Sequence, residues 1–278
     1  SGGGEVAEIF LEHRRGIKLV AEQGCLDAPL DMKRLCVTLR LVREGATHCM
    51  DLDRLSLDAL REGAHRLVGS AWNTPPSLPP LVFRARATPC PVRRPPDAVS
   101  RAEKEALVRR AESEGWAEGT RRCPGTLQQV AVQYEDSTQD IWIATAMREG
   151  TTWTCRLVFD RRIQCQLGVK VTAGRENSLQ VGEEHLGGAR GFEQFTDSMV
   201  AASAREAVRL VIQALEARHA PVGAFPVLFA GRAGGRLLHE TCIPGLEADH
   251  VLAGRSPFAG RLGERIAAPC VTLVDDGT

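Results

Sequence analysis

The first part of the chain alternates apolar and polar residues in the manner of β-strands. Residues 5–15 and 15–30 show partial alternation, with Gly16 and Gly24 as interruptions. Further along, apolar side chains recur at every second position and so share one face of a half-buried strand: Leu35, Val37, Leu39 and Leu41. These segments together predict an antiparallel sheet at the N-terminus.

Helical spacing of apolar residues marks three later stretches. The stretch after Leu55 has Ser56 or Asp53 as its N-cap, and a second helix from about Arg101 to Glu114 opens with the Ser-x-x-Glu capping signature. A third helix is predicted from Ser198 until just before Pro221. Residues 73–97, between the first two helices, are rich in proline, which predicts a linker or an extended arm that packs on its own protein.

The region from Gln128 to Val181 favours strands again. Four runs rich in Val, Ile, Thr, Trp and Phe end in clusters of Asp, Gly or Arg, and they predict an antiparallel meander. Downstream, residues 225–231 predict a short buried strand, and a glycine-rich turn then leads into a helix that Pro244 and Gly245 should end. The expected fold is α+β, with antiparallel sheets and packed helices, in two domains: residues 1–122, including the arm, and a larger β-rich domain over residues 123–278.

Composition narrows the classes of function. Thirty-five basic and 35 acidic residues cancel, which argues against nucleic acid and an anionic membrane as partners. No apolar run is long enough to span a bilayer, and the first residues lack the layout of a signal peptide. Nine cysteines, without a CxxC pair, favour reduced thiols and therefore a cytoplasmic location.

The residues best suited to chemistry lie between Leu237 and Asp249. His239 and Glu240 form the first half of a metallopeptidase pattern, in which a histidine binds the metal and the adjacent glutamate activates water. Four residues after His239, where the common zinc helix has its second histidine, this chain has Ile243. A buried structural histidine beside a surface glutamate would give the same dipeptide, so the pair alone is weak evidence.

Other residues nearby are candidates for a modified site. Cys242 lies three positions after His239, on the same helical face, and His250 lies eleven positions after it, nearly in phase if the helix resumed. Glu247 and Asp249 could orient a metal-binding histidine, or could belong to a structural turn. Cys242 also fits the alternative of a small buried apolar side chain.

The segment Pro226–Thr278 resembles the TldD/PmbA family of peptidase-like proteins. The resemblance rests on the sequences LLHE, GLEAD, SPFAGRLGERIA and VTLVDDGT. The catalytic TldD branch has HExxxH where this chain has HETCIP, so Pro244 stands at the second histidine. The TldE (PmbA) branch lacks the motif, and the chain therefore reads as TldD-type with a degenerate metal site.

This resemblance implies a zinc-dependent peptidase. His239 would be a zinc ligand and Glu240 the general base, with zinc incompletely held by this chain alone. The family would act on peptides, by hydrolysis or leader trimming, in a heterodimer with a TldD/TldE-like partner. The alternative is an inactive pseudopeptidase scaffold that binds extended peptide and supports its partner. Family members usually continue beyond VDDGT, so the remainder is expected to be a separate chain, a part cut away, or absent from a natural short form.

Overall fold

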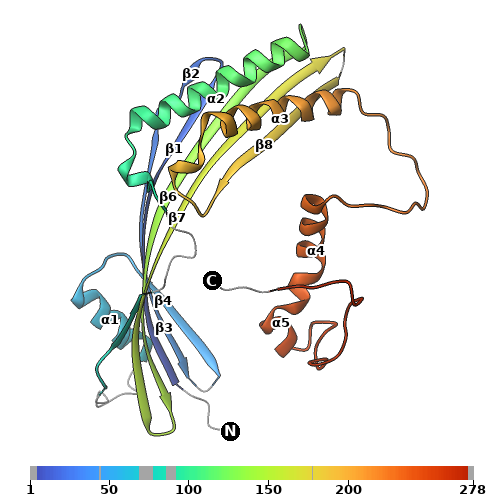
Figure 1. Cartoon of the computed structure of the whole chain (residues 1–278). Coiled ribbons are helices and arrows are strands. Elements are labelled where there is room, and N and C mark those ends of the chain that lie inside the picture. The colour runs from blue at the N-terminus through green and yellow to red at the C-terminus, as the bar shows by residue number, and fades with distance from the viewer. Residues whose placement is uncertain (1–4, 44, 69–77, 86–91, 177, 275–278) are drawn as a thin grey trace. The chain divides into compact units, whose positions relative to one another are not determined.

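The computed structural model describes residues 5–43, 45–68, 78–85, 92–176 and 178–274. The chain divides into two compact units, Ser1–Ala217 and Arg218–Thr278. The first unit combines a long antiparallel sheet with helices, and the second is helical where it is regular (Figure 1). The α+β class predicted from the sequence is confirmed.

In the described part of the chain, eight strands form one sheet in the order β4-β3-β1-β6-β7-β5, with β2 paired to β1 and β8 paired to β7. Neighbouring strands are antiparallel, except that β5 runs parallel to β7. The strands are β1 Glu5–Glu22, β2 Cys25–Leu26, β3 Leu30–Arg43, β4 Ala46–Leu52, β5 Val82–Ala85, β6 Leu127–Glu149, β7 Thr152–Arg175 and β8 Ser178–Gly188.

Two strand predictions were wrong in their boundaries. Gly16 does not interrupt β1, because it pairs with Ser137 in mid-strand and its missing side chain leaves room for the backbone of Asp136. The runs predicted as separate strands between Gln128 and Gly174 fuse into β6 and β7, which pair along their whole length. The polar residues between the runs are tolerated because they lie within the strand ladder, where the backbone remains hydrogen-bonded.

The predicted N-caps are confirmed in α1 (Leu57–Val68) and α2 (Arg101–Arg122). Ser56 Oγ accepts a hydrogen bond from Ala59 N at 3.1 Å, and Ser100 Oγ accepts one from Glu103 N at 3.3 Å. α2 runs two turns beyond the predicted end at Glu114. α3 spans Asp197–Leu215, and short 3₁₀ turns occupy Pro96–Ala98 (η2) and Phe192–Gln194 (η3).

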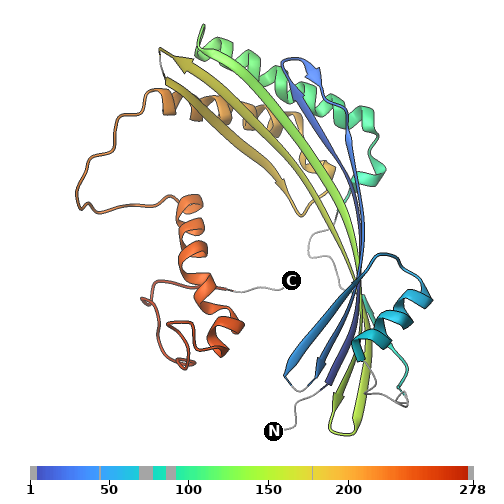
Figure 2. The same ribbon diagram turned by 180° about the vertical axis from the view of Figure 1, so that it is seen from behind.

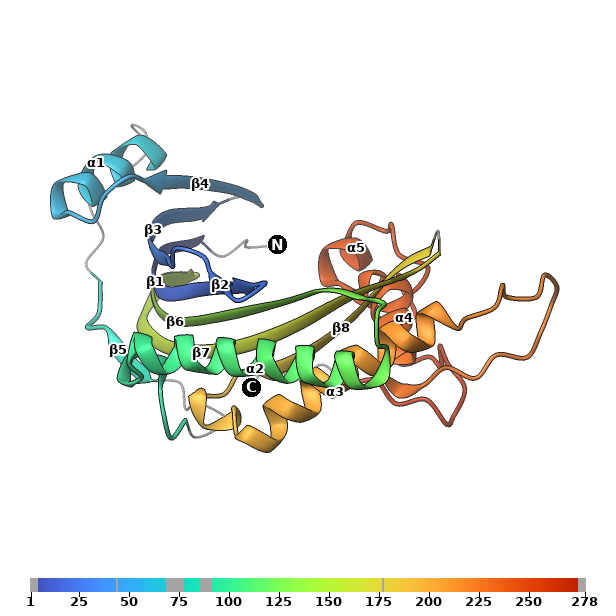
Figure 3. The same cartoon turned by 90° about the horizontal axis from the view of Figure 1, so that it is seen from above.

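The core of the first unit lies between one face of the strands and two helices. α2 and α3 run side by side over the ends of β1, β6, β7 and β8 (Figures 1 and 2). Tyr134 is fully buried there, with Phe192 and Phe195 edge-on to its ring. Every second residue of β1, β6 and β7 points to this same face of the sheet, which continues along the strands toward α1. α1 packs on β3 and β4 at the other end of the strands (Figure 3).

The proline-rich arm is described in part. Its residues 78–85 are extended, and β5 pairs with β7 along Arg156–Phe159, which agrees with an arm that packs on its own protein. Residues 73–77 and 86–91 of the predicted arm lie outside the described residues. Leu35, predicted to share the buried face of β3, is 50% exposed, whereas Val37 and Leu39 are buried.

The second unit departs from the prediction at two places. Residues 221–230 form no strand and are exposed, so the predicted buried strand over 225–231 was wrong. A short run of apolar residues does not by itself determine whether the segment is buried. α4 (Gly231–Leu246) continues through Pro244, and α5 (Ala248–Leu252) follows at once.

The predicted division at residue 122 falls inside the first unit, because β1 pairs with β6 across it.

None of the helices in the described ranges is long and apolar enough to cross a bilayer.

Candidate functional site

His239 and Glu240 are adjacent, exposed residues in the middle of α4. Arg236, one turn earlier on the same side of the helix, lies 3.5 Å from Glu240 Oε1. This ion pair is open to water, so it contributes little to stability, but it leaves a guanidinium beside the carboxylate. The sequence analysis did not single out Arg236, although its spacing of four residues from Glu240 is the signal for such a pair.

Pro244 occupies the position five residues after His239, within α4. Proline has no backbone N–H, so the carbonyl of Glu240 lacks its usual helical partner. A single missing bond near the end of the helix does not stop it, and α4 ends two residues later at Leu246. The proline ring offers no lone pair to a metal, so position 244 supplies no ligand.

Cys242 lies three residues after His239 and is half-buried. Its Sγ is 3.6 Å from Thr241 Oγ1, whose hydroxyl donates a hydrogen bond to the carbonyl of Leu237 at 2.7 Å. Residues three apart in a helix share a face, and imidazole and thiolate are both preferred zinc ligands. His239 and Cys242 therefore offer two suitable donors from one helix.

A second cluster forms where α4 passes into α5. Glu247, Asp249 and His250 offer ligand atoms that all lie within 4.8 Å of one another, and His250 Nε2 lies 3.9 Å from Asp249 Oδ2. Glu247 and Asp249 were predicted either to orient a metal-binding histidine or to belong to a structural turn. Their proximity to His250 makes all three residues candidate donors.

Local contacts fix the turn that holds this cluster. Glu247 is in an extended conformation between the two helices, at φ −67° and ψ 134°. Ser256 Oγ donates a hydrogen bond to the carbonyl of Gly245 and accepts one from Phe258 N at 2.9 Å. The ring of Phe258 packs on Gly245, where a Cβ would come within 3.0 Å of it. Gly245 therefore allows the following loop to pack against the end of α4.

The candidate residues do not all come together. Among the residues that the structure describes, only Glu247, Asp249 and His250 form a group of three donors, and His239, Glu240 and Cys242 are not part of it. The donor types on α4 suit zinc, but they are fewer than the three protein ligands of a catalytic zinc site. The described residues of this chain therefore fit zinc incompletely.

The segment that carries these residues matches a known family model. Residues 222–278 match the PmbA/TldA metallopeptidase C-terminal domain. The chain is 35% identical over 127 residues to a metalloprotease TldD homolog of Haemophilus influenzae, which covers 44% of this chain and 26% of that protein. It is 25% identical over 252 residues to a metalloprotease TldD homolog of Buchnera aphidicola, which covers 87% of this chain and 49% of that protein.

Solved structures share the fold at low sequence identity. A proposed modulator of a DNA gyrase from Thermotoga maritima superposes with a TM-score of 0.67 at 20% identity, over 94% of this chain and 56% of that one. TldE from Thermococcus kodakarensis superposes with a TM-score of 0.55 at 13% identity, over 92% of this chain and 55% of that one.

The matches to the two TldD homologs span about a quarter and about half of those proteins' lengths. The matched domain, the TldD homologs and the shared fold all agree with the motif segment around His239. The chain is therefore similar to the PmbA/TldD proteins, through the C-terminal domain matched by residues 222–278 and through the TldD homologs that it matches over part of their length.

Proposed function

We propose that this chain is a TldD-type subunit that acts on peptides, by hydrolysis or leader trimming, in a cytoplasmic heterodimer with a TldE-type partner. The observation that carries the proposal is the exposed His239–Glu240 pair on α4, inside the segment that matches a metallopeptidase domain. The names of the relatives support peptide chemistry, and the fold shared with a TldE supports the partner class.

In this proposal His239 is a zinc ligand and Glu240 is the general base. Bound zinc would polarise the scissile carbonyl and lower the pKa of a water molecule. Glu240 would accept the proton of the attacking water, and the guanidinium of Arg236 lies 3.5 Å from its carboxylate. Cys242, on the same face as His239, or His250 supplies a further ligand from this chain.

A partner enters the proposal because the donors on α4 are too few. His239 and Cys242 are two donors, and position 244 contributes none. A complete centre therefore needs either a local shift that brings His250 to His239 or a ligand from outside the described residues. Assembly of the heterodimer is the event that would supply it.

Pro244 favours a second candidate function, a pseudopeptidase scaffold. In that case the chain binds extended peptide and supports its partner without performing hydrolysis. The proline at the position of the second histidine favours this alternative. The two functions differ in whether Glu240 takes part in a reaction.

The test is turnover of an unfolded peptide by the complex of this chain with a TldE-type partner. If this chain is catalytic, Glu240→Gln abolishes turnover and leaves complex formation intact, and a strong zinc chelator abolishes turnover of the wild type. Glu264→Gln is the matched control, because Glu264 is an exposed carboxylate of the same unit that pairs with Arg261 at 2.9 Å. Unchanged turnover in Glu240→Gln would establish the scaffold instead.

A further inference from the structure

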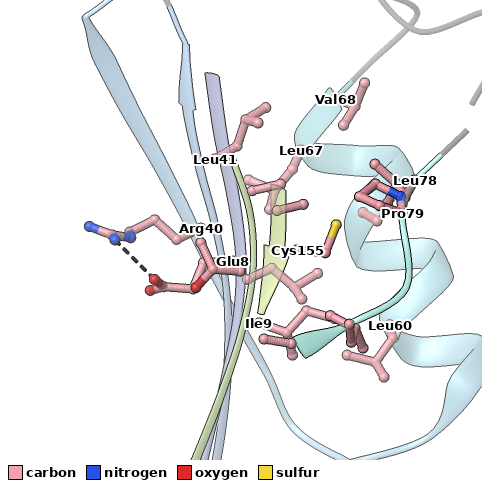
Figure 4. A pocket seen from close by; sticks show the side chains of 17 residues that line it. Glu8, Ile9, Arg40, Leu41, Leu60, Leu67, Val68, Leu78, Pro79 and Cys155 are labelled. Carbon is pink, nitrogen blue, oxygen red and sulfur yellow. Dashed lines mark hydrogen bonds and ion pairs between the residues drawn. The ribbon is translucent and has the colours of Figure 1, made fainter. Parts of the chain in front are cut away.

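An apolar pocket lies in the first unit, between α1, the arm at residues 78–81 and the strands (Figure 4). Its volume is about 400 Å³. Small-molecule pockets in proteins fall in the range of about 300–1,000 Å³, lined mostly by apolar side chains. The pocket is therefore large enough to be a binding site rather than a packing defect.

The strand register explains why space remains there. Ala7, Ala146 and Cys155 stand next to each other in one lateral row across β1, β6 and β7, and Ala144 lies two positions along β6 on the same face. Each of these side chains is small, and together they form the floor of the pocket. The strands beneath α2 and α3 carry larger side chains, which are fully buried. Side chains of that size would have filled the pocket.

One face of α1 forms the opposite wall. Leu60, Ala64 and Leu67 follow one another at intervals of four and three residues, which places them on one side of the helix. Leu78 and Pro79 of the arm close a third side (Figure 4). The walls thus come from segments far apart in the sequence, so the pocket depends on the tertiary fold.

The described residues that line the pocket offer little charge to a ligand. Glu8 and Arg40 contribute to its lining, but their side chains lie on the far side of the strands from α1 and pair with each other at 3.2 Å (Figure 4). Among the labelled side chains on the α1 side, the Cys155 thiol is the polar exception, and it is buried. A charged ligand would lose its hydration without gaining a partner.

We propose that this pocket binds a neutral aromatic or aliphatic molecule. An apolar cavity of about 150 Å³ is known to stay dry and to bind benzene, so a pocket more than twice as large suits a fused aromatic ring pair or a short hydrocarbon chain. The site is built within the first unit. It goes beyond the peptide chemistry proposed for α4, and neither proposal depends on the other.

The test is fluorescence titration of the full chain with N-phenyl-1-naphthylamine, a neutral apolar dye, after passage over a lipophilic resin. Saturable binding by one dye molecule per chain is expected. Ala146→Phe fills the floor of the pocket and should weaken binding by about tenfold or more. Ala64→Leu fills the pocket from α1 and should also weaken dye binding, so it serves as the test if Ala146→Phe does not fold.

Thr154→Phe is the control, since Thr154 is the exposed neighbour of Cys155 on β7 and its side chain points to the other face. It should leave binding within about twofold of the wild type. Absence of saturable binding by the wild type, or equal binding by both filled variants, would overturn the proposal.

Discussion

Lys104 Nζ on α2 lies 2.6 Å from Asp136 Oδ2 on β6, and the two side chains are 9% and 3% exposed. Tyr134 Oη donates a second hydrogen bond to the same carboxylate oxygen at 2.7 Å. A buried ion pair of this kind does not by itself make a fold more stable than apolar packing would. It does make the fold sensitive to the loss of one partner.

Lys104→Met should therefore destabilise the first unit. The substitution keeps the length of the side chain but leaves the buried Asp136 carboxylate without its positively charged partner, which costs about 3–5 kcal/mol of unfolding free energy. Urea denaturation followed by circular dichroism measures it. Lys170→Met, at an exposed position of β7, is the control. A loss for Lys104→Met no larger than for the control would contradict this account of the pair.

The thiol of Cys165 predicts a pH dependence on the alkaline side. Burial, with a further contribution from Asp136, raises the pKa of this thiol to about 12. A raised pKa means that the thiol contributes stability that is fully present below pH 9 and is lost as the pH rises toward 12. Between roughly pH 8 and 10.5, the wild type should lose more unfolding free energy than Cys165→Ala does.

The control for this measurement is Cys49→Ala, because Cys49 is exposed. It should follow the wild type across the same range. Parallel pH profiles for the wild type and Cys165→Ala would show that the buried thiol is not responsible.

A side chain at position 16 should cause a steric clash in the middle of β1. A Cβ at this position would overlap the backbone carbonyl of Asp136, which cannot move aside without disturbing β6. Gly16→Ala should cost about 1–3 kcal/mol of unfolding free energy. Gly168→Ala is the matched case, since its Cβ would meet the exposed ring of His185 at 3.1 Å, which can rotate away, and the backbone carbonyl of Gln133 at an ordinary contact distance of 4.0 Å. Equal effects of the two substitutions would be inconsistent with the close approach at Gly16.

A histidine at position 244 should affect both the stability of α4 and the retention of zinc. Pro244→His and Pro244→Ala both return an N–H to α4, and either should raise helix stability by up to about 3 kcal/mol. Only Pro244→His adds an imidazole, so it alone should retain more zinc than the wild type after dialysis. Elemental analysis of the three proteins measures the difference. Equal zinc in the histidine and alanine variants would mean that position 244 does not face a metal centre.

The sequence was sufficient for the parts of the fold that local chemistry decides. Ser56, with Asp53 as the alternative, and the serine of the Ser-x-x-Glu signature, Ser100, were predicted as N-caps, and both serines accept the expected hydrogen bond. The strand regions were also found, because alternation reflects burial of one face. The lengths of the strands were predicted wrongly where pairing with a distant strand outweighs a local turn residue. Gly16 is the example, because it continues β1 by pairing with Ser137, far along the chain.

The candidate site shows a similar division. His239 and Glu240 were singled out because they are adjacent and form part of a recognisable motif, and their roles stay a prediction. The proximity of Glu247 and Asp249 to His250 was not predicted, because the expected break at Pro244 left the geometry of the next turn open. The apolar pocket had no signal in the sequence, since it depends on the alignment of Ala7 with Ala146 and Cys155 across three strands.

The central claim is that this chain contributes His239 to a metal centre. The most direct measurement is the zinc content of its complex with a TldE-type partner, purified without chelator, for the wild type and His239→Ala. His219→Ala, at an exposed position of the same unit, is the control. The account predicts near-stoichiometric zinc in the wild type and the control, and its loss in His239→Ala. Equal zinc in all three complexes, or none in any, would contradict it.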